Sequence, residues 1–475
     1  MPSSPAFIEP LFPPLPLYGP PDLLRKGQIW FFRSLSFFLT LGFLLVIILG
    51  AIVTVLVPAT TYRFAHIILG KNPDKHRKFF KEERRRGQQF KHKSVKVTDS
   101  ISYYAALVDI EVEPFTCETL DGFTLHLQRL HDKRPMAPGA QARYPVLLLH
   151  GLLQSSGAFC VNDDDSLAFY LCKQGFDVWL GNNRCWNKPE HSVLEYGDPR
   201  LWAWNIRQMG GLDLPALIDT VCAHTNRKRI GFVGHSQGTT QTFCSLSRDQ
   251  HPELGLKMDS FCALAPATHA GALIDKLQFK FMRVLGSKGF RLFFGINAFI
   301  PLMMTFQKIL PGSWYGQTGY LVFNFLFDWS DALWDRRLKS RFFQFSPVYV
   351  SSESMRWWMR DFAIYRSILE DSDVAWFRKE TFPPLAFWTC GQDQLVNGQR
   401  FTERMKDHEA EVTIVHQECI EEYSHLDILW AMDSVDRVAR KVKEVLWACA
   451  SDRHEFVVPR GCDDVAYRID PRDRC

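Results

Sequence analysis

The sequence predicts an α/β fold in which a mostly parallel β-sheet is covered by helices on both faces. From about Val112 onward, short apolar runs alternate with segments of helical spacing, which is the pattern of βαβ units. Several runs, such as YPVLLLH, are continuously apolar, as strands buried on both faces are. One run leads into GHSQG, a Gly-x-Ser-x-Gly sequence that is typical of a sharp turn between a strand and a helix.

An apolar segment lies well before the predicted sheet. Residues 35–57, LSFFLTLGFLLVIILGAIVTVLV, carry no charge and are long enough to cross the hydrocarbon core of a membrane. A cleaved signal peptide has a shorter apolar region, and a helix buried in a soluble domain normally has a polar face. We therefore predict a single transmembrane anchor over residues 35–58. Residues 1–34 before it are rich in proline and are expected to be extended.

Basic residues gather after this anchor, in a juxtamembrane segment predicted over residues 59–108. The excess of Lys and Arg on this side predicts a single-pass membrane protein whose larger, C-terminal part faces the cytosol. Residues 71–96 mix phenylalanine with positive charge, which suits the surface of a membrane or a lipid droplet. The endoplasmic reticulum, a lipid droplet and the plasma membrane all fit. A solvated linker is the alternative, and nucleic-acid binding is not expected.

The elements of the predicted sheet follow in order from residue 109 to residue 265. A hairpin with its turn at Asp121-Gly122 comes first, because Asp-Gly is a hairpin turn signal. After it come the strand YPVLLLH, a helix that ends at Gly175, the strand FDVWL, a helix from Leu212, the strand RIGFVGH and the strand SFCALA. This interval is predicted to form the first part of the core.

The next interval, residues 266–380, is rich in Phe and Met and does not fit strands. Part of it is apolar enough to pass for a second membrane span, but Lys280, Arg283, Lys288 and Arg291 interrupt that part. We predict a helical cap, or lid, that covers the sheet and receives an apolar substrate; an ordinary helical subdomain is the alternative. The strand LAFWTC then returns the chain to the core, whose second part covers residues 381–450, before a tail over residues 451–475.

Three residues at predicted strand ends indicate nucleophilic catalysis. Ser236 lies in the strand–turn–helix motif between Gly234 and Gly238, but a serine hydroxyl needs an adjacent base and an orienting acid. Asp393 follows the late strand, and His425 follows the strand-like VTIVHQEC. Each is a common turn or loop residue, yet together they have the order Ser, Asp, His that this motif requires. The sequence therefore predicts a Ser–His–Asp triad.

Backbone amides would stabilise the negative charge that develops on the attacked carbonyl. One donor should be Gln237, which follows the nucleophile, and the second should come from the loop after LLLHG, at Leu152. His150 is interpreted as an organiser of that loop. This chemistry needs no metal and no organic cofactor.

Cysteine usage and glycosylation sequons limit the alternatives. Twelve cysteines in 475 residues do not make a disulfide scaffold, and the lack of a C-x-x-C pair disfavours a zinc or redox site. No N-x-[ST] sequon occurs, which disfavours a secreted or lumenal catalytic domain.

Six motifs together resemble the acid lipase family of α/β-hydrolases: LLLHGLLQSSGAF, NDDDSLAFYLCKQGFDVWLGNNR, DLPALID, GHSQGT, ALAP and YSHLDILWAMD. The family includes gastric and lysosomal lipases and membrane-anchored steryl ester hydrolases of yeasts, and the resemblance runs from about residue 109 to residue 445. It implies an α/β-hydrolase fold with a helical cap that acts on triacylglycerols or sterol esters. It also implies Ser236, Asp393 and His425 as the triad, with Leu152 and Gln237 as backbone donors.

The chain departs from the family pattern at a few positions. Arg184-Cys185 stands where the family usually has Arg-Gly, and Arg207-Gln208 where acidic residues usually precede Met-Gly, which puts local packing at the pocket rim in doubt. No cysteine lies between residues 262 and 390, so the cap disulfide of the secreted branch cannot form. The resemblance is therefore to the membrane-anchored branch. Two alternatives stay open: a lipid acyltransferase with the same triad, and a catalytically silent membrane scaffold.

Overall fold

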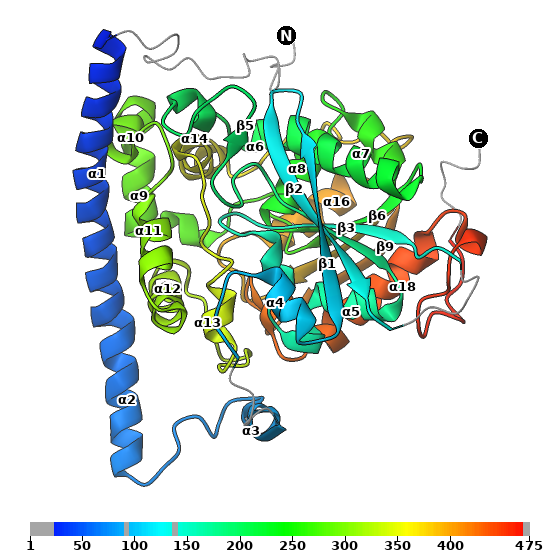
Figure 1. Cartoon of the computed structure of the whole chain (residues 1–475), viewed down its shortest axis with the longest axis horizontal. Coiled ribbons are helices and arrows are strands. Elements are labelled where there is room, and N and C mark those ends of the chain that lie inside the picture. Colours follow the sequence, from blue (N-terminus) through cyan, green and yellow to red (C-terminus); the bar gives the residue numbers. More distant parts are fainter. Residues whose placement is uncertain (1–22, 90–94, 135–140, 469–475) are drawn as a thin grey trace.

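The computed structural model describes residues 23–89, 95–134 and 141–468. Its β-sheet lies at the centre of the hydrolase domain, with helices around it (Figure 1). The sheet has nine strands in the order β1-β2-β4-β3-β6-β7-β8-β9, with β5 paired to β2. Pairing is parallel from β4 through β9 and antiparallel where β1, β2 and β5 form one side. The predicted mostly parallel sheet is confirmed. The strands are β1 Ile110–Glu118, β2 Phe123–Asp132, β3 Pro145–Leu149, β4 Asp177–Gly181, β5 Glu190–His191, β6 Ile230–His235, β7 Met258–Leu264, β8 Leu385–Cys390 and β9 Ile414–Ile420.

Apolar clusters lie on both faces of the sheet. In β3, Leu147 and Leu149 belong to one cluster, whereas Val146 and Leu148 belong to the other. Successive strand residues point to opposite faces, so a strand covered on both sides must be apolar throughout, as YPVLLLH is. The helices of the core are α4 Ile101–Ala106, α5 Leu167–Gln174, α6 Ile206–Gln208, α7 Leu214–Thr225, α8 Gln237–Ser245, α16 Gly398–Asp407, α17 Asp427–Trp430 and α18 Arg440–Cys449.

Two predicted turn glycines adopt the backbone conformation that required them. Gly122, in the β1–β2 turn, has φ of +85°, and Gly175, which ends α5, has φ of +110°. Side chains other than hydrogen are disfavoured there, so the sequence marks both turns.

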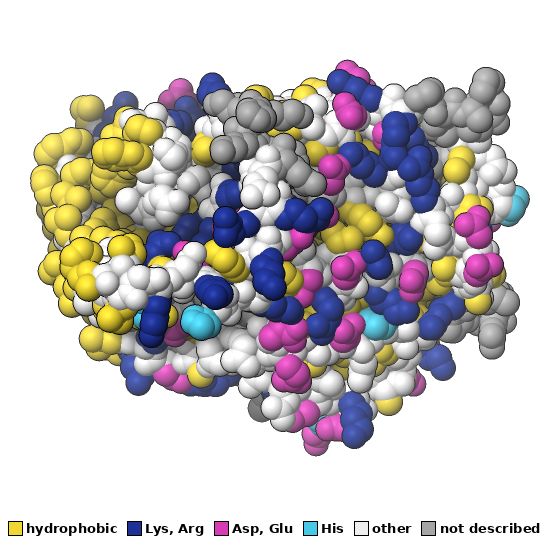
Figure 2. Space-filling model, turned by 90° about the horizontal axis from the view of Figure 1, so that it is seen from below, with side chains coloured by type: hydrophobic (Ala, Val, Ile, Leu, Met, Phe, Trp, Pro, Cys, Tyr) yellow, Lys and Arg dark blue, Asp and Glu magenta, His cyan; other side chains and the backbone are white. Residues whose placement is uncertain are grey.

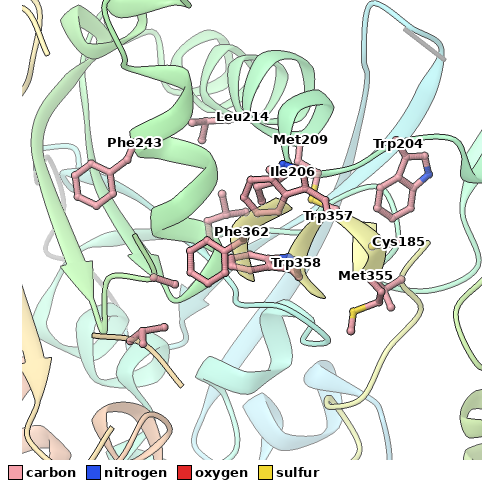
Figure 3. Close-up of a cluster of buried hydrophobic side chains, with 14 of the residues drawn as sticks. Cys185, Trp204, Ile206, Met209, Leu214, Phe243, Met355, Trp357, Trp358 and Phe362 are labelled. Atoms are coloured by element: carbon pink, nitrogen blue, oxygen red, sulfur yellow. The ribbon is translucent and has the colours of Figure 1, made fainter. Parts of the chain in front are cut away.

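The cap lies between β7 and β8. Its first helices, α9 to α11, divide the apolar stretch that could pass for a second span into three short segments. Cap residues Trp357, Trp358 and Phe362 pack in one cluster with Ile206 and Met209 of the core (Figure 3). The helices are α9 Leu277–Val284, α10 Gly286–Phe294, α11 Leu302–Ile309, α12 Gly312–Phe327, α13 Lys339–Phe342, α14 Ser352–Arg356 and α15 Ala363–Tyr365.

The N-terminal helix is longer than the predicted anchor. α1 Leu23–Ala51, a π-helical turn Ile52–Leu56 and α2 Val57–Ile68 form one 46-residue helix, which among the described residues is the single helix long and apolar enough to cross a membrane. It packs along α10 and α12 of the cap (Figure 1). The buried side chains recur at helical spacing: Ser36, Thr40, Leu44, Ile47 and Ala51.

Ser36 and Thr40 place two hydroxyl groups on the buried side of α1, which the apolar composition of the segment did not predict. The Ser36 hydroxyl donates to the carbonyl of Arg33 at 3.2 Å, and the Thr40 hydroxyl donates to the carbonyl of Ser36 at 2.6 Å. Because both hydroxyls are satisfied within the helix, they can lie in apolar surroundings at little cost.

The side of the molecule formed by α1 and the adjacent cap is apolar. Figure 2 shows hydrophobic side chains covering this side, whereas charged side chains are spread over the rest of the view. We call it the apolar face. Exposed residues from these elements include Leu45, Val46, Leu49, Val53, Val284, Leu292 and Ile309.

The basic segment after the helix contains α3 Phe80–Gln89. Of the predictions above, the proline-rich residues 1–22, residues 90–94 of the basic segment and residues 469–475 of the tail lie outside the described residues.

Candidate active site

Ser236 lies at the junction of β6 and α8 with a strained backbone, φ 51° and ψ −116°. The flanking glycines make this turn possible. A Cβ atom on Gly238 would lie 2.5 Å from the carbonyl oxygen of Leu149, and one on Gly234 would lie 3.1 Å from the backbone of Gly238. Larger residues would collide with backbone atoms, so the sharp turn that presents the Ser236 hydroxyl depends on both glycines.

Asp393 and His425 meet Ser236 in one hydrogen-bonded line. His425 Nε2 lies 2.7 Å from Ser236 Oγ, and His425 Nδ1 lies 2.6 Å from Asp393 Oδ2. The other carboxylate oxygen of Asp393 accepts hydrogen bonds from the amides of Leu395 at 2.9 Å and Val396 at 3.1 Å. The neighbouring strands β8 and β9 bring the acid and the base together. These distances suit proton transfer between a nucleophile and a base.

The loop after β3 lies directly against Ser236. A Cβ atom on Gly151 would be 3.0 Å from Ser236 Cβ. The side chain of Gln154 holds this loop, since its Oε1 accepts from the Gly151 amide and from His235 Nδ1, both at 3.0 Å. His150 Nε2 accepts from the amide of Asn183 at 3.2 Å, as expected of a residue that organises the loop.

Burial keeps two histidines near the site neutral. It lowers the pKa of His150 to about 4. It also places the pKa of His235 well below its usual value, and the nearby His425 acts in the same direction. His425 is the histidine that contacts Ser236, whereas the side chains of His150 and His235 are uncharged at neutral pH.

Leu152 and Gln237, the predicted backbone donors, both lie beside Ser236. Leu152 lines the cavity beside Ser236, and Gln237 is the first residue of α8. Neither backbone amide donates a hydrogen bond to another residue within the described chain. Unpaired amides at a helix start and in an adjacent loop can stabilise an oxyanion.

The cap supplies residues that the sequence reasoning missed. The ring of Trp329 stacks on His425, with centroids 6.2 Å apart and an interplanar angle of 8°. Trp358 Nε1 donates to Gln237 Oε1 at 3.1 Å. This hydrogen bond from the cap fixes the side chain of Gln237, which is one of the predicted oxyanion residues. No local pattern marks these tryptophans, because their partners lie about a hundred residues away in the chain.

An apolar cavity of about 80 Å³ lies beside Ser236. Cap residues form much of its wall, among them Phe279, Phe323, Phe327, Met355, Met359 and Phe362. This volume is below the roughly 300–1,000 Å³ of pockets for drug-sized ligands.

The two departures from the family pattern are accommodated by local contacts. Arg184 is buried and forms ion pairs with Asp213 at 2.6 Å and Asp121 at 2.8 Å. Cys185 packs in the apolar cluster that contains Trp204 (Figure 3). Gln208 accepts a hydrogen bond from the Asn205 amide at 2.9 Å and closes the start of α6.

Two family profiles and several relatives match the chain. The profile of the partial α/β-hydrolase lipase region matches residues 101–163, and that of the α/β-hydrolase fold matches residues 144–283. Sterol esterase 2 of Saccharomyces cerevisiae is 36% identical over 392 residues, which cover 74% of this chain and 72% of the relative. The chain belongs to the acid lipase family of α/β-hydrolases.

More distant members of the acid lipase family also align over most of the chain. Gastric triacylglycerol lipase of Bos taurus is 28% identical over 381 residues, covering 74% of this chain and 91% of the relative. Human lysosomal acid lipase/cholesteryl ester hydrolase is 28% identical over 385 residues, covering 74% and 90%. The predicted family, fold and enzyme class are confirmed: this acid lipase family member is a carboxylic ester hydrolase of the lipid-ester class.

Proposed function

We propose that this protein is a membrane-anchored serine esterase that hydrolyses steryl esters, triacylglycerols or both to free fatty acid and alcohol. The observation that supports this most directly is the hydrogen-bonded line from Ser236 through His425 to Asp393, next to an apolar cavity. Relatives named sterol esterase and triacylglycerol lipase support the substrate class. The preference between the two esters depends on the shape of the opened cap.

The proposed reaction is a two-step acyl transfer. Ser236 Oγ attacks the ester carbonyl while His425 Nε2 takes its proton, and Asp393 holds the imidazole and stabilises its positive form. The amides of Leu152 and Gln237 stabilise the oxyanion. His425 then gives the proton to the departing alcohol. A water molecule, deprotonated by the same histidine, releases the fatty acid from Ser236.

A lipid-class profile tests the substrate proposal. Purified full-length protein is offered emulsions of sterol ester and triacylglycerol, together with vesicles of a choline phospholipid as a control. We expect fatty acid from the neutral esters and little from the phospholipid, because the residues that line the cavity include no Lys or Arg that would pair with the headgroup phosphate. Cleavage of short soluble esters without any release from neutral lipids would contradict the proposal. Acyl transfer to added sterol would instead indicate a transferase.

We further propose that the N-terminal helix holds the enzyme on a membrane or lipid-droplet surface with its catalytic domain in the cytosol. The apolar face, formed by α1 and the cap, would place the cap against lipid (Figure 2). Such a position suits an enzyme whose substrate is insoluble in water.

Protease treatment of intact vesicles from the cytosolic side should therefore remove the hydrolase domain. The excess of basic residues after the apolar run predicts this orientation. A soluble protein enclosed in the same vesicles should stay intact and controls for leakage. Protection of the domain, or glycan addition to a sequon engineered near residue 460, would show that the orientation is reversed.

A further inference from the structure

The juxtamembrane residues Asp74 to Lys78, which we call the latch, contact two regions beside the candidate active site. One is the segment of the cap between α12 and the start of α13, residues 329–339. The other is the loop that carries His425, residues 421–433. The sequence left open whether this basic segment binds lipid or is a solvated linker. In the structure several of its side chains are paired with the hydrolase domain.

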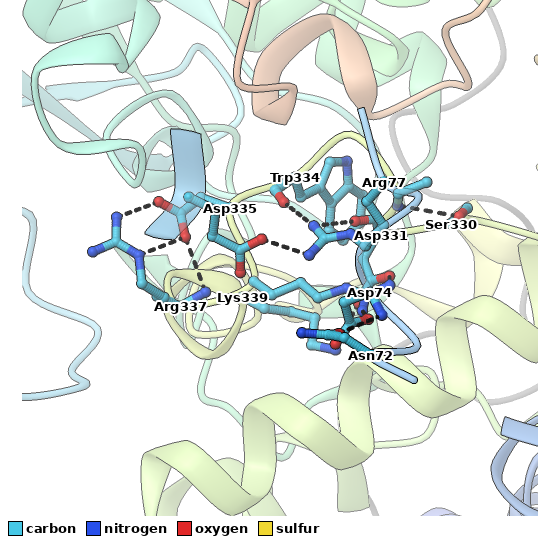
Figure 4. A network of polar contacts seen from close by, with 12 residues as sticks. Asn72, Asp74, Arg77, Ser330, Asp331, Trp334, Asp335, Arg337 and Lys339 are labelled. Atoms are coloured by element: carbon cyan, nitrogen blue, oxygen red, sulfur yellow. Dashed lines mark hydrogen bonds and ion pairs between the residues drawn. The ribbon is translucent and has the colours of Figure 1, made fainter. Parts of the chain in front are cut away.

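Arg77 makes the central contact of the latch. Its Nη2 donates to the carbonyl oxygens of Trp334 at 2.8 Å and Asp331 at 3.4 Å, and its Nη1 pairs with Glu83 at 2.5 Å. Only 10% of the Arg77 side chain is exposed. Figure 4 shows the guanidinium facing the cap residues. Because the guanidinium is planar and its donors are fixed, it sets the position of the cap backbone more tightly than a lysine would.

A second set of ion pairs fastens the same cap residues. Arg336 bridges Asp74 at 2.5 Å and Asp331 at 2.7 Å, and Lys339 pairs with Asp331 at 2.9 Å (Figure 4). Burial opposes ionisation of Asp331, but Lys339 and Arg336 hold its pKa below the usual value. The Asp331 carboxylate is therefore charged at neutral pH and keeps its ion pairs with Arg336 and Lys339.

Trp334 connects this network to the histidine loop. Its Nε1 donates to Asp427 Oδ1 at 2.7 Å in a fully buried position. Asp427 Oδ2 accepts from the amide of Ser424 at 2.6 Å and from its hydroxyl at 2.7 Å. Ser424 directly precedes His425. The indole of Trp334 thus helps to fix the backbone from which the candidate base projects.

The latch also contacts the histidine loop directly. Lys78 Nζ lies 2.9 Å from Asp433 and 3.3 Å from Glu422, which are on either side of His425 in the chain. On the cap side, Trp329 lies two residues from Asp331 and stacks on the His425 ring. The latch therefore contacts both the loop that carries His425 and the cap segment that contains Trp329, whose ring stacks on His425.

We propose that Arg77 is a positioning residue for the esterase reaction. By fixing the carbonyls of Asp331 and Trp334, it keeps Trp334 against Asp427 and Trp329 over His425, so that His425 Nε2 stays in line with the Ser236 hydroxyl. This inference rests on the proposed triad. It makes the segment that leaves the membrane helix a part of the active-site support.

Point variants of the full-length protein in detergent micelles test this role with a short soluble ester. Arg77→Met should lower kcat about tenfold and leave KM near the parent value, because a small misplacement of a catalytic group slows chemistry without removing substrate contacts. Arg77→Lys should recover part of the loss. The matched control is Arg85→Met, since Arg85 is exposed and pairs with Glu82 within α3. It should retain the parent kcat.

A double-mutant cycle with Trp334→Phe, which removes the indole N–H, separates positioning from general destabilisation. If both residues act along one connection, the double variant should lose little more kcat than the worse single variant. Thermal unfolding is followed for each variant, and rates are compared well below the lowest midpoint. Parent-like kcat in Arg77→Met, or additive losses in the double variant, would overturn the positioning role. If the parent protein showed no esterase activity, or if a fluorophosphonate probe did not label its Ser236, the proposed function would be overturned instead.

Discussion

Ser236→Ala should reduce esterase kcat by about 10⁶-fold, the scale seen when a serine nucleophile is removed. The hydroxyl has His425 as its hydrogen-bond partner, so the substitution removes the attacking atom and little else. The backbone φ of 51° strains Ala as much as Ser, and the Ser236 amide keeps its bond to Leu264 O at 3.0 Å. We therefore expect a folded, membrane-bound, inactive protein. Hydrolysis of a short soluble ester by the purified variant measures the loss.

A fluorophosphonate probe gives an independent readout of the same residue. It should label the parent at Ser236 and should not label the variant. Ser245→Ala is a matched control on the same helix, because the Ser245 hydroxyl is buried and has no hydrogen-bond partner among the residues that the structure describes. That control should keep both labelling and activity. Labelling that persists in Ser236→Ala would exclude this serine as the nucleophile.

The sequence predicted those parts of the site that depend on local patterns. Continuous apolar runs marked the parallel strands, and two glycines around Ser236 marked the sharp turn after β6. Asp393 and His425 could be placed because each follows such a run, and adjacent parallel strands end at the same edge of a sheet. Local spacing, turn chemistry and motif order were sufficient for this.

Contacts between distant segments could not be predicted in the same way. Trp358 is separated from Gln237 by 121 residues, and Arg77 from Trp334 by 257. Nothing in a run of Lys and Arg distinguishes a solvated residue such as Arg85 from a buried one such as Arg77, because the difference is made by carbonyl groups elsewhere in the chain. The burial of Thr40 on the cap side of α1 could not be predicted either, because apolar residues surround it in the sequence.

Asp393→Asn should lower kcat by about 10⁴-fold, and the structure indicates why. Asp393 Oδ1 accepts from the amides of Leu395 and Val396, so an asparagine would keep its carbonyl oxygen there and turn its NH₂ group toward His425. His425 Nδ1 would then have to accept a hydrogen bond, which places the imidazole proton on Nε2. An Nε2 that carries a proton cannot take the proton of the Ser236 hydroxyl.

Further measurements and one control variant accompany Asp393→Asn. The rate of fluorophosphonate labelling at Ser236 should fall together with kcat, because both reactions need the same base, whereas KM and the thermal unfolding midpoint should change little. Asp407→Asn, at the exposed end of α16, should match the parent in every measurement. If Asp393→Asn kept kcat within about threefold of the parent, against the roughly 10⁴-fold loss expected, another group would have to orient His425. Asp427, whose oxygens bind Ser424 and Trp334 in the structure, would then be the next carboxylate to test.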